Sequence, residues 1–262
     1  MTRRRLDAEL VRRKLVASRS AAQEAIASRS VEVNGLVATK ASSQVDEKVS
    51  IRFVGAPARF VSRGGLKLEA ALGRFAIEVV DRNALDVGAS TGGFTDCLLQ
   101  RGAARVVAVD VGYGQLDWRI RNDPRVEVHE RFNARHMESP ALGGPFDVVV
   151  TDLSFISLRT VAPALVAVGG PDTDWVLLVK PQFEAGRGQV GKGGIVRDVA
   201  VRAETLRNVI ETFEGRGLGA RGVTDSPIAG AKGNREFLLW LRREPTIVTE
   251  ADFGQLTGLT DA

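Results

Sequence analysis

The chain has 262 residues, 44% of them hydrophobic, so it is long enough for one large domain and a small additional one. Its single cysteine, Cys97, excludes an internal disulfide and suits a reducing compartment, so we expect a cytoplasmic protein. No apolar run approaches the ~18 residues of a membrane span, and the arginine-rich start lacks the hydrophobic core of a secretion signal. We therefore expect no interaction with a membrane.

The net charge of +4 is concentrated near the N-terminus. Residues 1–60 hold 12 Lys and Arg against 6 Asp and Glu, whereas the rest of the chain holds 24 against 26. A local basic excess favours binding to a polyanion, most often a phosphate backbone, although a merely solvated basic face would have the same composition.

The first fifty residues predict a small unit of two helices and several short strands. Apolar residues at helical spacing predict a first helix over 6–15, and a second helix is expected over 21–27. Alternating residues 31–33 run into Asn34-Gly35, which is the strongest short-range signal for a β-hairpin. A further strand is expected over 49–54.

This α+β unit resembles the small RNA-binding fold shared by a small-subunit ribosomal protein, tyrosyl-tRNA synthetases and many pseudouridine synthases. The resemblance lies in residues 17–26 followed by 31–35. It predicts an RNA-binding domain over 1–57 and a linker over 58–62. The basic residues expected to contact RNA are Arg3, Arg4, Arg5, Arg12, Arg13, Arg19, Lys40 and Arg63.

The stretch from Asn83 to Leu99 predicts a buried strand, a turn rich in glycine and a helix. Glycines in such a turn let a cofactor lie close to the main chain. The Gly-Lys-Ser/Thr of a phosphate loop is absent, and Ser90 replaces the second glycine of the dinucleotide fingerprint. The remaining interpretations are another nucleotide-like cofactor or a purely structural strand-turn-helix.

A second acidic residue, Asp110, follows the next predicted strand, where it could accept hydrogen bonds from both hydroxyls of a ribose. Together with Asp86 and the glycine turn, it resembles the S-adenosylmethionine site of class I methyltransferases. The pattern that follows alternates strands with helices as far as a last strand over 236–241. The alternation predicts an α/β Rossmann-like sheet, and the resemblance implies that it is a class I S-adenosylmethionine-dependent methyltransferase sheet, in a domain over 63–245 with a tail over 246–262.

Polar residues follow the predicted parallel strands, and ligands of such sheets bind beyond the carboxyl ends of the strands. We therefore expect Asp86, Asp110, Asn133, Asp152 and Lys180 at one rim. Residues 186–194 include five glycines and could form either a loop that closes over a nucleotide or a disordered insertion.

The whole chain resembles the TlyA family of ribosomal RNA 2′-O-methyltransferases, and its larger domain resembles the wider FtsJ-like group. Six motifs carry the resemblance: Ser62–Lys67, Asp86–Thr95, Asp110–Leu116, Asp152–Ser157, Lys180–Glu184 and Gly233–Phe237.

The resemblance implies a catalytic tetrad of Lys67, Asp152, Lys180 and Glu236. Taken alone, Lys67 would be interpreted as a solvated charge on a helix. In the implied roles, Lys180 lies beside a second ammonium group and acts as a base or stabilises an alkoxide, while Lys67 orients the ribose. The two carboxylates hold these groups and the hydroxyl in register.

The resemblance also implies that S-adenosyl-L-methionine is the cofactor and that no metal is required. The two histidines, His129 and His136, lack acidic partners at a ligand spacing. The cofactor-binding residues would be Asp86, Gly88, Ser90, Thr91, Gly92, Gly93 and Phe94, with Asp110 on the ribose and Asn133 and Ala134 beside the adenine.

The substrates implied are cytidines of 16S and 23S rRNA within ribosomal subunits, where methylation can influence sensitivity to cyclic-peptide antibiotics. Two other functions remain alternatives. The first is a ribosome-binding protein without catalysis, which the complete tetrad disfavours. The second is a cytolysin, because the family is also called haemolysin; no strongly basic amphipathic helix with an aromatic-rich face supports it.

Overall fold

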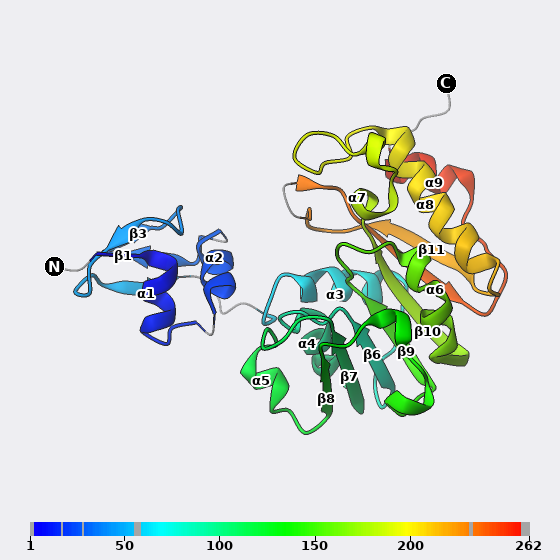
Figure 1. Cartoon of the computed structure of the whole chain (residues 1–262), viewed down its shortest axis with the longest axis horizontal. Coiled ribbons are helices and arrows are strands. Elements are labelled where there is room, and N and C mark those ends of the chain that lie inside the picture. The colour runs from blue at the N-terminus through cyan, green and yellow to red at the C-terminus, as the bar shows by residue number, and fades with distance from the viewer. Residues whose placement is uncertain (1–2, 17, 28, 55–58, 231–232, 258–262) are drawn as a thin grey trace. The chain divides into compact units, whose positions relative to one another are not determined.

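The computed structural model describes residues 3–16, 18–27, 29–54, 59–230 and 233–257. The chain divides into two compact units, residues 1–62 with two small sheets and residues 63–262 with one large sheet (Figure 1). The start of the predicted linker, residue 58, lies outside the described residues.

The first unit packs two helices on short antiparallel strands. Leu6, Leu10, Ala22, Ile26, Val31 and Val45 form its core. Strand β2 pairs with both β3 and β5, and β1 pairs with β4. The elements are β1 (Arg4–Arg5), α1 (Leu6–Arg12), α2 (Arg19–Ala27), β2 (Val31–Val33), β3 (Leu36–Val37), β4 (Gln44–Val45) and β5 (Ile51–Phe53).

Two local predictions for this unit have different outcomes. The Asn34-Gly35 turn joins β2 to β3 as expected, with both residues at positive φ, of 51° and 81°. The first helix, predicted over 6–15, ends at Arg12. Lys14 adopts a φ of 56°, and the Leu15 amide bonds back to the Leu10 carbonyl, so the chain turns off the helix before Leu15.

The second unit is built on a seven-stranded sheet in the order β11-β12-β10-β9-β6-β7-β8. The five strands from β10 to β8 in this order are parallel, whereas β12 is antiparallel to both β10 and β11. The strands are β6 (Asn83–Val87), β7 (Arg105–Asp110), β8 (Val126–Glu130), β9 (Phe146–Thr151), β10 (Gly169–Val179), β11 (Gly219–Asp225) and β12 (Phe237–Arg242). The predicted Rossmann-like sheet is thereby confirmed.

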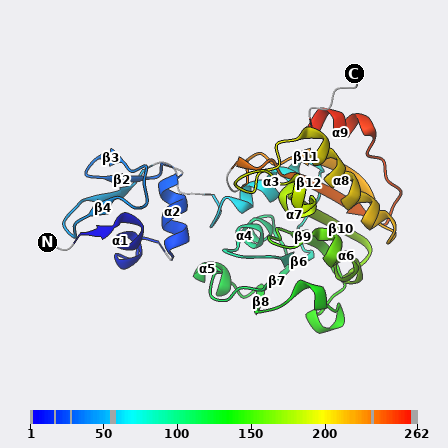
Figure 2. The same ribbon diagram turned by 45° about the horizontal axis from the view of Figure 1, so that its top comes forward.

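Helices cover both sides of this sheet, with α3 and α4 on one side and α6 and α8 on the other (Figures 1 and 2). Within the described residues, no helix is long and apolar enough to cross a membrane. The helices are α3 (Gly64–Arg74), α4 (Gly93–Gln100), α5 (Trp118–Arg121), α6 (Leu158–Ala167), α7 (Pro181–Glu184), α8 (Val199–Glu214) and α9 (Glu250–Thr257), with 3₁₀ turns at Ala134–His136, Pro140–Leu142 and Arg187–Gln189.

The segment that the sequence analysis treats as a tail contributes to the core. Helix α9 packs on α8, and its Phe253 is 5% exposed within the main apolar cluster. Arg207 of α8 also forms an ion pair with Glu250 at 2.6 Å. The compact unit therefore extends past the expected end of the domain at residue 245.

The sheet topology brings several strand ends together. Asp110 ends β7, while Asp152 and Lys180 directly follow β9 and β10. Because β12 is antiparallel to β10, with Phe237 opposite Val179, the residue before β12 lies at this same edge. Glu236, which directly precedes β12, therefore lies where the parallel strands end.

Candidate active site

The glycine turn after β6 contains residues with positive φ, a backbone conformation that residues other than glycine rarely adopt. Gly88 and Gly92 have φ angles of 91° and 93°, and Ser90 has a φ of 48°. A Cβ atom on Gly88 would lie 2.8 Å from the backbone oxygen of Asp152, a contact that only a backbone shift could relieve. Glycine at this position therefore lets the turn pack directly against the loop after β9.

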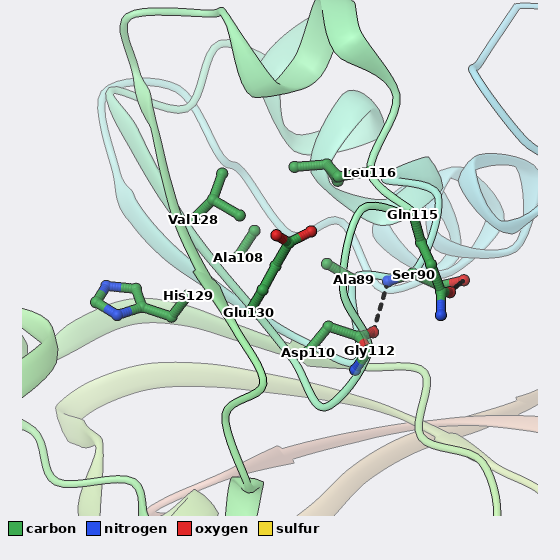
Figure 3. Close-up of a pocket in the computed structure, with 10 residues that line it drawn as sticks. All are labelled: Ala89, Ser90, Ala108, Asp110, Gly112, Gln115, Leu116, Val128, His129 and Glu130. Atoms are coloured by element: carbon green, nitrogen blue, oxygen red, sulfur yellow. Dashed lines mark hydrogen bonds between the residues drawn. The ribbon is translucent and has the colours of Figure 1, made fainter. Parts of the chain in front are cut away.

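Asp110 is held rigidly beside this turn. Its Oδ2 accepts the backbone N–H of Ser90 at 2.8 Å, and its Oδ1 accepts that of Gly112 at 2.6 Å (Figure 3). The carboxylate is only half-buried, and each oxygen has a further lone pair. Asp110 can therefore accept two more hydrogen bonds from a ligand without moving.

A small pocket opens beside Asp110, with apolar side chains on its walls and polar groups at its rim (Figure 3). A slot lined by apolar side chains with a few polar groups is the usual setting for a small ligand. The lining residues of the pocket are Ala89, Ser90, Ala108, Asp110, Gly112, Gln115, Leu116, Val128, His129 and Glu130. No cofactor role was predicted for Gln115, which belongs to the Asp110–Leu116 motif, or for His129 and Glu130, because their place depends on how β7, β8 and the intervening loop meet.

The other residues predicted for the cofactor are not among those that line this pocket. Gly93 and Phe94 begin α4, and the Phe94 side chain is 3% exposed. The Thr91 carbonyl accepts the N–H of Asp117 at 3.2 Å. Asn133 caps the 3₁₀ turn that follows β8, and Ala134 packs against the core.

Asp86 is fully buried under the glycine turn. Its Oδ2 accepts the Thr95 hydroxyl at 2.6 Å, whereas its Oδ1 has no hydrogen-bond partner in the described part of the chain. Burial raises the pKa of Asp86 to about 7, and the negative charges of Asp152 and Asp110 add to the rise, although the Thr95 bond opposes it. Strained or perturbed groups of this kind concentrate at functional sites.

The four residues of the implied tetrad form two ion pairs. Lys67 Nζ lies 2.5 Å from Glu236 Oε2, with these side chains 11% and 3% exposed. Lys180 Nζ lies 2.5 Å from Asp152 Oδ1 and also donates to Ser154 Oγ at 2.9 Å. Each lysine therefore has a carboxylate partner of its own. Pairing is what makes buried charges tolerable.

Gly230 makes room for the Glu236 carboxylate. A Cβ atom on Gly230 would lie 1.9 Å from Glu236 Oε1, so any larger residue would displace the carboxylate or the loop. The same loop is tied down by Asn234, which donates to the Gly194 carbonyl at 2.8 Å and accepts from the Val196 N–H at 3.2 Å. Glu236 is thus linked to the end of the glycine-rich 186–194 segment.

Glu184 joins the loops that carry Asp152 and Lys180. Its carboxylate, 5% exposed, accepts the Ser157 hydroxyl at 2.6 Å and the Leu158 N–H at 2.7 Å, at the N-terminus of α6. Burial raises the pKa of Glu184, while these two hydrogen bonds act against the rise. Glu184 belongs to the Lys180–Glu184 motif, but no role for it was predicted from the sequence.

An exposed aromatic side chain stands on the first of these loops. Phe155 is 91% exposed, has a φ of 64°, and lies 5.2 Å from the Phe183 ring centroid. A large apolar residue held in a left-handed conformation three residues after Asp152 is an unusual surface feature. It offers a flat face to a substrate beside the ion pair.

In the first unit, the predicted RNA contacts fall into two groups. Arg5 and Arg19 pair with Asp7, while Arg12 and Arg13 pair with Glu9. The remaining predicted contacts, Arg3, Arg4 and Lys40, lie at or near the surface, and Arg63 precedes α3 in the second unit. Among the described residues, no group of three or more His, Cys, Asp or Glu is arranged to hold a metal ion.

Together, the sheet order, the glycine turn and the charged strand ends define a Rossmann-type methyltransferase with an appended RNA-binding unit. Comparison with known families agrees: the FtsJ-like methyltransferase family matches residues 60–243, and the S4 domain matches residues 4–51. The chain belongs to the TlyA family within the FtsJ-like methyltransferases.

Three similar proteins support this assignment. The 16S/23S rRNA (cytidine-2′-O)-methyltransferase TlyA of Mycobacterium tuberculosis is 53% identical over 92% of this chain and 91% of its own length. The 23S rRNA (cytidine-2′-O)-methyltransferase TlyA of Campylobacter jejuni is 31% identical over 69% of this chain and 70% of its own. A solved Streptococcus thermophilus structure whose name includes the word hemolysin has a TM-score of 0.79 and 38% identity, covering 98% of this chain and 95% of its own.

The stability of an Asp86→Asn variant should depend less on pH than that of the wild type. The pKa of Asp86 is about 7 in the folded chain against an ordinary value of 3.8, so the folded state binds more protons between these values. The free energy of unfolding contributed by Asp86 therefore falls as pH rises through this window. Urea unfolding at pH 4.5 and 7.5 should show the wild type losing ~1 kcal/mol or more relative to the variant. An equal difference at both values would contradict the assignment.

A Glu184→Ala variant should transfer methyl groups more slowly while binding cofactor normally, because the Asp152 and Lys180 loops lose their common anchor. Leaving the two donors of Ser157 and Leu158 without a partner should also lower the free energy of unfolding by ~2 kcal/mol. Single-turnover rates well below the unfolding temperature measure the first effect.

The matched control is Thr173→Val, which removes hydrogen bonds to Phe146 and Gly170 at the other end of β9 and β10. It should lower stability but leave the rate near that of the wild type. Equal rate losses in the two variants would mean that Glu184 acts only through overall stability.

Proposed function

We propose that this protein transfers a methyl group from S-adenosylmethionine to the ribose 2′-oxygen of cytidines in ribosomal RNA. The observation that carries the proposal is the Asp152–Lys180 ion pair, which lies at the same sheet edge as the Asp110 pocket and the Lys67–Glu236 pair. A ribose hydroxyl and a methyl donor must meet at such an edge for direct transfer.

The residues around the pocket fit the proposed cofactor. Asp110 has two free acceptor positions for a ribose, and apolar Ala89, Ala108, Leu116 and Val128 flank the slot. The unpartnered Oδ1 of Asp86 provides a further acceptor beneath the turn. When bound, the cofactor supplies an electrophilic methyl group on a sulfonium centre.

The ion pair explains how a weakly nucleophilic hydroxyl can react. The Lys180 ammonium group has three N–H donors, of which Asp152 and Ser154 occupy two. The third is available to the 2′-oxygen, where it stabilises the negative charge that develops as the oxygen–carbon bond forms. The hydroxyl proton passes to the Asp152 carboxylate, whose side chain is 24% exposed, and the Lys67–Glu236 pair fixes the ribose.

The S4 unit and the curated relatives support ribosomal RNA as the substrate. The relative named for both 16S and 23S rRNA is more similar to this chain than the one named for 23S rRNA, which favours action on both subunits in the cytoplasm. The exposed Phe155 ring beside Lys180 suits stacking on an unpaired base. As the family resemblance implies for methylation of these ribosomal RNAs, loss of the protein would alter sensitivity to cyclic-peptide antibiotics.

The Lys180→Ala variant should lose methyl transfer by a factor of ~10³ or more, because the donor to the developing alkoxide is gone. The test incubates separated small and large ribosomal subunits with methyl-labelled S-adenosylmethionine and maps the label by mass spectrometry. The expected product is 2′-O-methylcytidine in both subunits, absent with the variant.

Cofactor affinity, measured by calorimetry, should be nearly unchanged in this variant. Loss of cofactor binding would reassign Lys180 to the cofactor site. No transfer by the wild type to either subunit would favour the ribosome-binding protein without catalysis.

A further inference from the structure

The basic first unit buries a carboxylate beneath the arginines expected to contact RNA. Asp7 is 0% exposed, although it lies in the first turn of α1 in a segment rich in positive charge. Its Oδ1 accepts Arg5 Nε at 3.0 Å, and its Oδ2 accepts Arg5 Nη2 at 2.8 Å, forming a two-pronged pair. Burying a charge costs free energy unless the charge is paired, so Asp7 depends on these hydrogen-bonded partners.

Asp7 also holds residues of the second helix. Its Oδ2 accepts Arg19 Nη2 at 3.2 Å and Gln23 Nε2 at 3.1 Å. Arg5 lies in β1 and Arg19 begins α2, so Asp7 connects two cations from different elements. The hydrogen bonds from Arg5 hold the pKa of Asp7 well below its usual range, so it stays ionised under working conditions.

The two arginines remain available on their outer side. Their side chains are 43% and 57% exposed, although both are bonded to a carboxylate that is not exposed at all. A guanidinium group has five N–H donors, so each arginine keeps donors for a second anion. Holding the stems in advance removes conformational entropy that binding would otherwise cost.

Glu9 forms a contrasting arrangement on the same helix. It pairs with Arg12 and Arg13, but Arg13 is only 21% exposed and also donates to the carbonyls of Val49 at 2.8 Å and Glu47 at 2.9 Å. Arg13 therefore braces α1 against the 46–49 segment. Asp7 itself accepts the Ala8 N–H at 2.9 Å, but within the described residues neither Arg5 nor Arg19 donates to a backbone carbonyl, so their remaining N–H groups are left for another anion.

We propose that Asp7 is a positioning residue for RNA recognition, which holds Arg5 and Arg19 as one prearranged site for adjacent backbone phosphates. The inference rests on the proposed function, since it needs an RNA substrate. It adds a residue that does not itself touch RNA to those predicted from positive charge.

The proposal predicts an effect opposite in sign to simple electrostatics. Asp7→Asn makes the unit more positive by one charge, which by itself would tighten binding to RNA. If the carboxylate positions the arginines, the variant should instead bind purified bacterial 50S subunits roughly tenfold more weakly, as two side chains must be ordered on binding. Filter binding at several salt concentrations measures the affinity.

The matched control is Glu47→Gln, which adds the same charge at an exposed position of the same unit. Its affinity should equal or exceed that of the wild type. An Asp7→Asn affinity equal to or tighter than the wild type would overturn the proposal.

A double-mutant cycle separates positioning from general structural damage. In an Arg5→Ala/Arg19→Ala background, adding Asp7→Asn should change affinity by no more than about twofold, because nothing remains to position. A tenfold loss in that background would show that Asp7 acts through folding. Because Asp7→Asn could itself impair folding, the exposed Gln23→Met serves as a second variant, with a smaller loss that should also vanish in the double background.

Methylation kinetics keep this test distinct from that of the proposed function. Asp7→Asn should raise KM for subunits while leaving kcat and cofactor affinity unchanged. A wild type that methylates no subunit refutes the proposed function, whereas an active wild type with an unchanged KM in the variant refutes only the role of Asp7.

Discussion

The antiparallel position of β12 between β10 and β11 is the constraint on which the active site depends. The parallel strands deliver Asp110, Asp152 and Lys180 to one edge, as any doubly wound sheet would. A further parallel strand would have brought its start to the opposite edge. Because β12 runs the other way, Glu236 begins its strand next to Lys180, and Lys67 of α3 reaches it across the edge.

The charges collected at this edge are tolerated because they occur in pairs. Each lysine has a carboxylate at 2.5 Å, and the Asp152–Lys180 pair gains a third partner in Ser154. Buried ion pairs add little net stability compared with apolar packing, so these pairs are not explained by stability alone. Glu184 is a further buried carboxylate with partners. It accepts hydrogen bonds at the N-terminus of α6 and so connects the loop after β9 to the loop after β10.

In both units, a carboxylate restrains a long cationic side chain through an ion pair. In the larger unit, Asp152 and Glu236 form ion pairs with two buried lysines; in the smaller, buried Asp7 pairs with arginines that stay exposed on their outer side. In both cases the anion removes freedom from a long, flexible cation. Recognition and catalysis each benefit, because the entropy of ordering is lost on folding rather than on binding.

The sequence by itself determined the elements whose signals are local. The Asn34-Gly35 hairpin, the glycine turn after β6 and the alternation of strands and helices follow from residue type and spacing. The family motifs also singled out Lys67, which no spacing argument would have distinguished from a solvated lysine. The hairpin, the glycine turn and the alternation of elements can be predicted from the sequence because each depends on residues only a few positions apart.

Only the tertiary structure decided which charges meet. Each tetrad lysine pairs with its own carboxylate, and Arg13 donates hydrogen bonds to backbone carbonyls. Phe253, which lies in the predicted tail, packs in the core. The tertiary structure also gave Glu184 its role as an anchor and assembled the pocket around Asp110 from separate strands. The physical reason is that a side chain's partners depend on distances between elements far apart in sequence, which local patterns do not encode.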